Sequence, residues 1–323
     1  MEFNLSGLSR KQKATTEKNV KVLILGAGPA GMAAALYAAR AELEPIVLTG
    51  MLLGGQAAIT HMIENYPGFP EGVGGSEIGD LFQKQAERFG AKFEYGSVTA
   101  VDLSERPFKV TADNATTYFA QALIIATGAN SVRLKVPGEA ELTGKGVSYC
   151  ATCDGWFFKN KKVIVVGGGD SALEEAIFLT RFATSVTIVH RRDALRAGAI
   201  LQNRAKENPK IEFAWNTVIT EISGDEKVTA VKTRNVATGE IGQIDADGVF
   251  IFIGHTPNSN LFNNQLKLDS NGFIVIDNQM QTNIAGVYAA GEVADPHFRQ
   301  VVTSAGMGAS AAIEATRFLE ANN

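Results

Sequence analysis

A strand-like run, a glycine-rich turn and a helix-like stretch of small residues follow one another twice in this chain. The first copy has "VKVLIL" at 20–25, "GAGPAG" at 26–31 and a predicted helix over 32–40. The second has "KVIVV" at 162–166, "GGGDSA" at 167–172 and a predicted helix over 173–181. A further strand-like run follows each copy, at 44–49 and at 186–189. Parallel strands need a crossover of this length, so the repeat predicts an α/β fold with two Rossmann-like, three-layer domains.

The rest of the chain contains further strand and helix patterns. Apolar periodicity predicts a helix over 78–89, and a helix rich in small residues is expected at about 304–320. Strands or hairpin-like runs are expected at 92–95, 97–119, 121–126, 211–219, 228–235 and 248–253. Residues 1–19 are polar and without periodicity, which indicates a flexible arm. A transit peptide is the alternative, but Glu2 and Glu17 argue against it.

Composition excludes some partners. The chain has 323 residues, 45% of them apolar, which is enough for roughly two domains with substantial cores. Its formal net charge is -4, so we expect no binding to nucleic acid or to an anionic membrane. No apolar run approaches the roughly 18 residues of a membrane span, and no signal-peptide pattern is present. A cytoplasmic protein is expected.

The first glycine turn matches the dinucleotide fingerprint G-x-G-x-x-G through Gly26, Gly28 and Gly31. Glycines there allow a tight turn and close approach of a diphosphate to the N-terminus of the following helix. The fingerprint departs from its standard form at the end of the next strand, where Leu48 and Thr49 stand instead of an acidic residue. The contacts to an adenosine ribose are therefore left open.

The second turn fits the variant G-x-G-x-x-A through Gly167, Gly169 and Ala172. The strand after it ends in "HRRD", with Arg191 and Arg192, and Arg196 follows shortly. Guanidinium groups at this place suit a 2'-phosphate, so the second site is expected to take NADP(H) rather than NAD. The alternative is an ordinary solvated basic turn.

The only two cysteines, Cys150 and Cys153, lie in the segment "CATCDG". A C-x-x-C pair next to βαβ patterning indicates a redox dithiol, whereas two inert thiols or half of a zinc site are the alternatives. Electrons from a nicotinamide reach a disulfide readily only through an intermediary such as a flavin. The first dinucleotide site is therefore expected to hold FAD, and no metal is expected.

Together these motifs resemble the low-molecular-weight thioredoxin reductases. The resemblance spans about residues 20–320 and rests on the following segments: "GAGPAG", "GGQ" at 54–56, "ENYPGFP" at 64–70, "ATGA", "CATCDG", "GGGDSALEEA", "HRRD", "GHTPN" and "FRQVVTSAGMGASAA". It implies an FAD domain at 1–128 and 256–323, split in sequence by an inserted NADPH domain at 129–255 that carries the C-x-x-C. It also implies a homodimer with thioredoxin as the protein substrate.

The resemblance assigns roles within the site. Cys153 corresponds to the thiol that faces the flavin, and Cys150 to the thiol that attacks thioredoxin. Asp154 corresponds to the general acid that protonates a leaving thiolate, although an aspartate before Gly155 is also a common turn residue. His190 is expected to pack beside the nicotinamide cofactor rather than to take part in catalysis.

Two groups of residues are predicted to bind the cofactors. In the FAD site Glu292 stands where the family usually has aspartate. The predicted FAD residues are Gly26, Gly28, Pro29, Ala30, Gly31, Gly55, Gln56, Asn65, Thr127, Gly128, Glu292, Arg299, Gln300 and Val301. The predicted NADPH residues are Gly167, Gly169, Asp170, Ser171, Ala172, His190, Arg191, Arg192 and Arg196.

Three other functions are weighed against thioredoxin reduction. A dithiol oxidase of the same fold would pass electrons from a small-molecule dithiol through FAD to oxygen, and the intact nicotinamide motif argues against it. A flavoprotein that reduces a peroxidase partner would carry an additional N-terminal thioredoxin-like region, which the residues before the first strand are not expected to supply. A non-enzymatic FAD protein would have no need of the C-x-x-C pair.

Overall fold

The computed structural model describes residues 16–60 and 62–322, which form an α/β structure of two compact units. The first unit contains the described residues up to Ala58, then Gly75–Gly128, then those from Pro257 onward. The second contains Ile59–Gly74 and Ala129–Thr256. Apart from the segment Ile59–Gly74, the chain passes from one to the other at Gly128–Ala129 and at Thr256–Pro257. The strands at these crossings, β7 (Ala129–Ser131) and β16 (His255–Pro257), pair with each other.

The first unit is built on a seven-stranded sheet. Strands β3, β2, β1 and β6 are neighbours in that order and run parallel, and β17 pairs in parallel with β6. Strands β4 and β5 extend the sheet as an antiparallel meander. The bounds are β1 Thr16–Leu25, β2 Ile46–Leu48, β3 Lys92–Glu94, β4 Val98–Asp102, β5 Phe108–Ala112, β6 Thr116–Ile125 and β17 Val287–Ala289.

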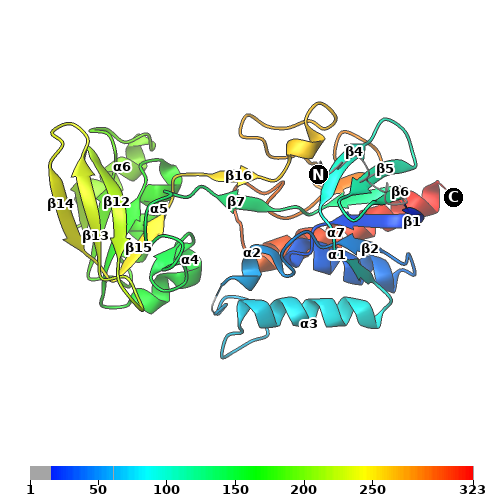
Figure 1. Ribbon diagram of the computed structural model, residues 1–323, viewed down its shortest axis with the longest axis horizontal. Coiled ribbons are helices and arrows are strands. Elements are labelled where there is room, and N and C mark those ends of the chain that lie inside the picture. The colour runs from blue at the N-terminus through cyan, green and yellow to red at the C-terminus, as the bar shows by residue number, and fades with distance from the viewer. Residues whose placement is uncertain (1–15, 61, 323) are drawn as a thin grey trace, which may run out of the picture. The chain divides into compact units, whose positions relative to one another are not determined.

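The helices of the first unit lie on one face of this sheet (Figure 1). They are α1 (Pro29–Arg40), α2 (Gly55–Ala58), α3 (Gly75–Arg88) and α7 (Val301–Ala321). Alanines of α1 and α7 are fully buried between them, which allows the two helices to pack closely. The buried side chains of the other face form a second cluster with side chains of the meander and with Phe262, which lies in the short 3₁₀ turn η2 (Asn260–Phe262) and is fully buried.

The second unit has three layers. Its central five-stranded parallel sheet has the order β11, β10, β9, β15, β8. Helices cover one face, and an antiparallel sheet of β12, β13 and β14 covers the other. The strands are β8 Val147–Ser148, β9 Lys162–Val166, β10 Ser185–Val189, β11 Ile211–Ala214, β12 Thr217–Ser223, β13 Ala230–Asn235, β14 Ile241–Asp245 and β15 Gly248–Ile251. The helices are α4 Ala151–Asp154, η1 Gly155–Phe158, α5 Asp170–Leu179 and α6 Ala199–Glu207.

The first strand begins earlier than the sequence predicts. Residues 16–19 belong to β1 and pair with residues 116–119 of β6, so the prediction of an arm is wrong for them. The Lys18 ammonium is 2.7 Å from the Glu94 carboxylate and holds this polar end of the strand in place. Residues 1–15 lie outside the described part of the chain.

Several elements differ from the sequence prediction. The expected hairpin at 97–119 and strand at 121–126 become β4, β5 and one continuous strand, β6. The run 211–219 divides into β11 and β12, and α6 and β14 were not predicted. The loop Ile59–Gly74, which the sequence does not separate from the first domain, groups with the second unit. Over residues 16–60 and 62–322, no helix is both long and apolar enough to cross a membrane.

Candidate functional site

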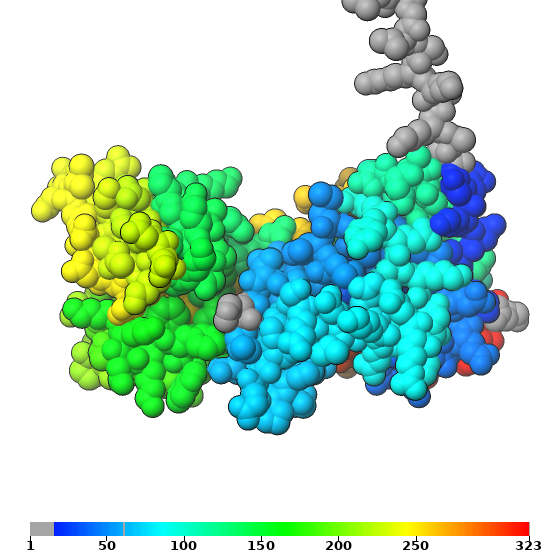
Figure 2. All heavy atoms as spheres, turned by 60° about the horizontal axis from the view of Figure 1, so that its bottom comes forward, coloured from blue at the N-terminus to red at the C-terminus, as the bar shows by residue number. Residues whose placement is uncertain are grey.

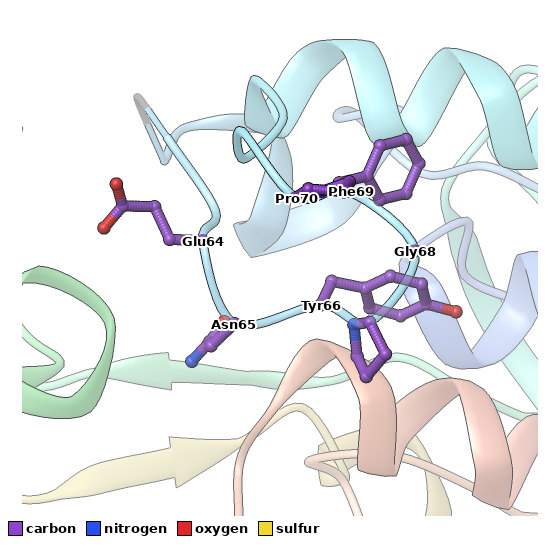
Figure 3. A pocket seen from close by; sticks show the side chains of 7 residues that line it. Glu64, Asn65, Tyr66, Gly68, Phe69 and Pro70 are labelled. Carbon is purple, nitrogen blue, oxygen red and sulfur yellow. The ribbon is translucent and has the colours of Figure 1, made fainter.

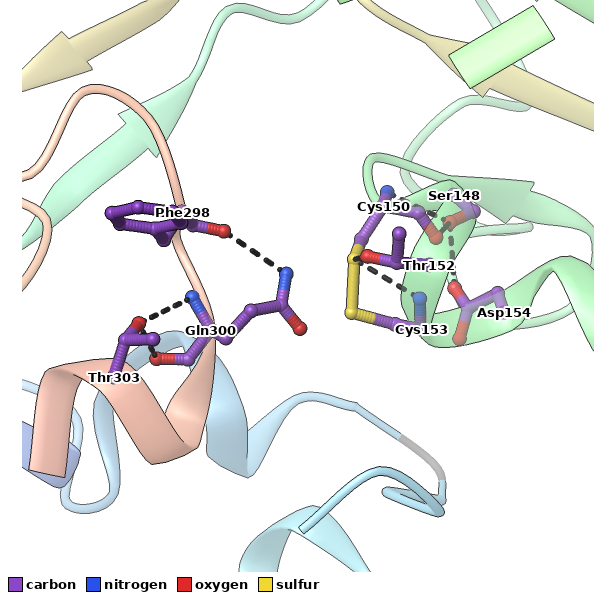
Figure 4. The surroundings of a disulfide bond; sticks show 8 residues. All are labelled: Ser148, Cys150, Thr152, Cys153, Asp154, Phe298, Gln300 and Thr303. Carbon is purple, nitrogen blue, oxygen red and sulfur yellow. Dashed lines mark hydrogen bonds between the residues drawn. A yellow bond between two sulfur atoms is a disulfide. The ribbon is translucent and has the colours of Figure 1, made fainter. Parts of the chain in front are cut away.

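The two cysteines form a disulfide bond in the second unit, with Cα atoms 5.3 Å apart (Figure 4). Cys150 is the N-cap of the short helix α4, and its Sγ accepts a hydrogen bond from the backbone N–H of Cys153 at 3.2 Å. The hydroxyl of Thr152 lies 3.4 Å from the same sulfur. Both cysteine side chains are half-buried. The helical turn therefore holds the two sulfur atoms in bonding position.

Asp154 is the last residue of this helical turn. Its Oδ2 accepts a hydrogen bond from the hydroxyl of Ser148 at 2.6 Å, as Figure 4 shows. The same hydroxyl oxygen accepts the backbone N–H of Cys150 at 3.1 Å. Burial raises the pKa of Asp154 above its ordinary value, and the hydrogen bond from Ser148 lowers it in part. A carboxyl group with a raised pKa next to a redox disulfide is suited to donate a proton.

The first glycine turn of the chain forms the N-terminus of α1. A Cβ atom on Gly31 would lie 1.9 Å from the carbonyl oxygen of Gly26, so only glycine permits this turn. At Gly28, the N-cap of α1, a Cβ would meet only the Cα of Gly55, at 4.0 Å. No side chain caps α1, and Pro29 occupies its first turn. The first N–H groups of the helix thus face an open cradle that fits a diphosphate.

Three other segments of the first unit meet this turn. The backbone of Ala126 lies against Gly26, where a Cβ would be 2.3 Å from its oxygen. Next to it, the hydroxyl of Thr127 donates to the carbonyl of Asn258, whose side-chain amide donates to the carbonyl of Thr127, each at 2.8 Å. Gly291 packs on Ala30, where a Cβ would come within 2.9 Å of the alanine Cβ. Segments far apart in sequence therefore converge on the N-terminus of α1.

The segment before α7 is shaped by Asp295. Its buried carboxylate accepts the backbone N–H groups of His297, Phe298 and Arg299 at 2.9, 2.9 and 3.1 Å. This ordered loop leads into Gln300, the N-cap of α7, which forms a reciprocal capping box with Thr303 (Figure 4).

Glu292 lies in the same region of the first unit. Burial raises the pKa of Glu292, the Arg299 guanidinium lowers it and the Asp295 carboxylate raises it further.

The second glycine turn leads from β9 into α5. Gly167 has a φ of 155°, and a Cβ there would lie 2.5 Å from the carbonyl oxygen of Phe252. The buried ring of His190 covers Gly168 so closely that a Cβ would lie 2.3 Å from it. Gly169 is the N-cap of α5 without a side-chain cap, and a Cβ there would meet only Arg196 Nη2, at 3.9 Å. This open N-terminus next to a guanidinium also fits a diphosphate.

A basic loop folds back onto this second turn. The backbone N–H groups of Arg196 and Ala197 donate to the carbonyl of Gly168 at 2.7 and 3.2 Å. The carboxylate of Asp170 accepts the N–H of Gly198 at 2.7 Å. Arg191 and Arg192 remain exposed on the loop. These contacts order the loop, and they show that Asp170 holds the protein backbone.

The comparisons with known proteins agree on one family. The sequence model of the pyridine nucleotide-disulphide oxidoreductases matches residues 20–308. The chain is 52% identical to the thioredoxin reductase of Rickettsia bellii over 303 residues, covering 93% of this chain and 98% of that protein. It is 49% identical to that of Streptomyces coelicolor over 302 residues, covering 93% and 94%. The chain belongs to the thioredoxin reductases.

Solved thioredoxin reductase structures share the fold. The crystal structure of the enzyme from Streptococcus pyogenes has a TM-score of 0.89 and 44% sequence identity, covering 94% of this chain and 99% of that one. The thioredoxin reductase from Giardia duodenalis also has a TM-score of 0.89, with 40% identity, and covers the same shares. The prediction of this family and of its α/β fold with Rossmann-type domains is therefore confirmed.

The predicted site residues of this thioredoxin reductase fall into separate groups. The first unit brings Gly26–Gly31 together with Gly55, Thr127 and Gly291, the residue before Glu292. In the second unit His190 and Arg196 lie against the glycine turn at the start of α5, and Cys150 caps α4, which contains Cys153 and Asp154. Asn65 belongs to neither group. It lies in the exposed loop Glu64–Pro70, which lines a shallow hollow of about 370 Å³ (Figure 3).

Some residues that shape these sites were not predicted. Ser148 carries no motif signal, because it acts through hydrogen bonds that only the folded chain brings together, and the three hydrogen bonds to Asp295 also appear only in the folded chain. Asn258 stands in the segment "GHTPN", which resembles the family and could have revealed it, and Gly291 directly precedes the predicted FAD residue Glu292.

Proposed function

We propose that this chain uses NADPH to reduce the disulfide of thioredoxin, by way of FAD and the Cys150–Cys153 pair. The observation that carries the proposal is the disulfide at α4, in a chain that also has two open, uncapped helix N-termini behind glycine turns. The identity of about 50% to thioredoxin reductases over most of the chain supports the same reaction.

The first unit is proposed as the FAD domain and the second as the NADPH domain. The start of α1, with Gly26, Gly28 and Gly31, would hold the FAD diphosphate, and the segment 292–301 would lie along the rest of the cofactor. The start of α5 would hold the NADPH diphosphate, while Arg191, Arg192 and Arg196 would bind its 2'-phosphate. Bound there, FAD would supply the two-electron relay between NADPH and the disulfide.

The cysteines then pass the two electrons to thioredoxin by thiol–disulfide exchange. Reduction of the disulfide takes two electrons and two protons and gives two thiols. The thiolate of Cys150 then attacks the thioredoxin disulfide, forms a mixed disulfide and releases one thioredoxin thiolate. The thiolate of Cys153 attacks Cys150 Sγ, which frees the second thioredoxin thiolate and restores the Cys150–Cys153 bond. The order of the two cysteines follows the resemblance to the family.

Asp154 is proposed as the proton donor of this exchange. A thiolate is a better leaving group when a nearby acid protonates it, and burial keeps Asp154 protonated to a higher pH than an exposed aspartate. We therefore assign Asp154 to the protonation of the departing sulfur.

The chain is further proposed to act as a cytoplasmic homodimer. Large apolar side chains are exposed on the helical side of the first unit, among them Tyr37 at 45%, Leu81 at 42% and Phe89 at 38%. Helix α3, which carries Leu81, lies on the surface in the space-filling view (Figure 2). Such side chains suit a second copy of the chain, and sedimentation of the purified protein tests the oligomeric state.

A coupled assay tests the reaction. Oxidation of NADPH is followed with thioredoxin and a disulfide reporter, and again without thioredoxin. We expect turnover that depends on thioredoxin and is lost in both Cys150→Ser and Cys153→Ser. If NADPH oxidation ignores thioredoxin, or if a dithiol is oxidised by oxygen without NADPH, the chain is an oxidase and the proposal is wrong.

A further inference from the structure

We infer that Ser148 is a positioning residue for the thiol exchange, whose hydroxyl holds the Asp154 carboxyl group in both its ionised and its protonated form. The inference rests on the proposed role of Asp154 and deepens it. Because of Ser148, Asp154 can lose and regain a proton without leaving a buried polar atom without a hydrogen-bond partner.

The position of Ser148 is fixed by its surroundings. Its side chain is buried, with 5% of its surface exposed, and it ends strand β8, where it pairs in register with Phe250 of β15. The next residue, Tyr149, is anchored through its hydroxyl, which donates to the buried carboxylate of Glu139 at 2.8 Å. The hydroxyl of Ser148 therefore has a defined place between the backbone of Cys150 and the side chain of Asp154.

The hydroxyl can serve Asp154 in two arrangements. When Asp154 is ionised, Ser148 donates its single proton to Oδ2 across 2.6 Å and accepts the N–H of Cys150. When Asp154 is protonated, the carboxyl can donate to Ser148 Oγ, and the serine proton can turn to the carbonyl of Cys150, which lies 3.2 Å away. Each arrangement gives every proton an acceptor, so the cost of an unsatisfied buried group is avoided in both.

The pKa of Asp154 depends on few groups. Among the described residues, only burial and the Ser148 hydroxyl account for the shift in the pKa of Asp154. Helix α5 packs against α4 and carries the ionisable residues Asp170, Glu174 and Glu175, none of which contributes to this shift. The neighbouring turn η1, "GWFF", has no ionisable side chain. Removal of the Ser148 hydroxyl should therefore act directly on the proton affinity of Asp154.

The sign of the effect follows from the hydrogen bond. The hydrogen bond from Ser148 is stronger when Asp154 is ionised than when it is protonated, because it is then charge-assisted. A variant without the hydroxyl therefore destabilises the carboxylate more than the protonated acid and raises the pKa of Asp154 further. Loss of one hydrogen bond to a charged group corresponds to an upward shift of about one pH unit. The alkaline limb of thioredoxin turnover should move upward with it, because the acid stays protonated to a higher pH.

The matched pair Ser148→Thr and Ser148→Val tests the inference, since the two side chains have similar volume and differ in the hydroxyl. Ser148→Ala serves as a third variant that removes the hydroxyl without adding bulk. The pKa of Asp154 is measured in the flavin-loaded protein by carbon-13 NMR of carboxyl-labelled aspartate, with Asp154→Asn identifying the signal. Thioredoxin turnover is recorded over the same pH range.

We expect the Asp154 signal to titrate at higher pH in the valine and alanine variants and near the parent value in the threonine variant. Equal titration in all four proteins, or an equal shift in threonine and valine variants, would overturn the inference. If Asp154→Asn keeps full turnover with an unchanged pH profile, the proposed role of Asp154 fails. The NMR titration still decides whether Ser148 controls the carboxyl proton, so the two failures are distinguishable.

Discussion

Two glycines of helix α7 allow the close contact between α1 and α7 to be tested by the same substitution. A Cβ atom on Gly308 would lie 2.0 Å from the carbonyl oxygen of Ala30 in α1. Gly306 lies two residues earlier on the same helix, and a Cβ there would meet nothing within 4 Å. Gly308→Ala and Gly306→Ala therefore make the same chemical change in opposite surroundings.

The two variants should change stability in opposite directions. Alanine is favoured over glycine inside a helix by about 0.5–1 kcal/mol, so Gly306→Ala should stabilise the protein by about that amount. Gly308→Ala receives the same gain, but the 2.0 Å contact must open to at least 3.0 Å, which requires the two helices to move apart. Overpacking of this kind costs about 1–3 kcal/mol, so the net effect should be a loss of roughly 1–2 kcal/mol.

The same displacement should reach the proposed FAD site, because Ala30 lies in the first turn of α1. Urea unfolding midpoints give the stability of both variants, and flavin fluorescence during dialysis against a mild chaotrope reports how firmly FAD is held. We expect Gly308→Ala to unfold earlier and to release flavin faster than the parent, with Gly306→Ala at or above the parent in both. Equal stability and equal flavin retention in the two variants would refute the reasoning.

Three further predictions follow from the charged residues. Replacing Arg191 and Arg192 by alanine should weaken NADPH binding by about 1 kcal/mol each, since both are exposed, and should leave NADH nearly unaffected; equal Kd changes for both coenzymes would contradict this. Glu292→Ala should raise the Kd for FAD while Glu292→Asp should not, and equal flavin release by the alanine variant and the parent would remove Glu292 from the site. Burial raises the pKa of Glu94, but hydrogen bonds from Lys18 and Tyr118 outweigh it and hold the pKa below the ordinary value. The stability that Glu94 contributes is thus present above its unfolded pKa and lost as the pH falls through the lower folded pKa. Hydrogen exchange at residues 16–19 should accelerate over that acidic range in the parent, and a Glu94→Gln variant should show no such step.

The features that the sequence predicts best are those whose cause is local. The two glycine turns are specified in part by Gly26, Gly31 and Gly167, which must lack a side chain because neighbouring backbone occupies the space of a Cβ. The short pattern of glycines is therefore visible in the sequence. It correctly predicts that α1 and α5 follow the two turns. Both helices begin three residues earlier than the apolar pattern indicates.

The features that the sequence misses depend on distant partners. The polar residues 16–19 show no strand periodicity, and their pairing with β6 and the ion pair between Lys18 and Glu94 are contacts across 76 or more positions. Strand β14 is largely exposed, so its side chains lack the alternation that marks a half-buried strand. In such segments tertiary pairing decides the structure, and local propensity does not reveal it.

Three aspartates, Asp154, Asp170 and Asp295, differ in the group that donates a hydrogen bond to them, and this difference distinguishes a structural role from a chemical one. Asp295 accepts three backbone N–H groups and Asp170 accepts one. A backbone N–H can only donate, so both carboxylates act as fixed acceptors that order a loop. Asp154 is held instead by the hydroxyl of Ser148, which can donate or accept. Of these three carboxyl groups, Asp154 is therefore the one whose partner remains satisfied when it takes up a proton, as the thiol exchange requires.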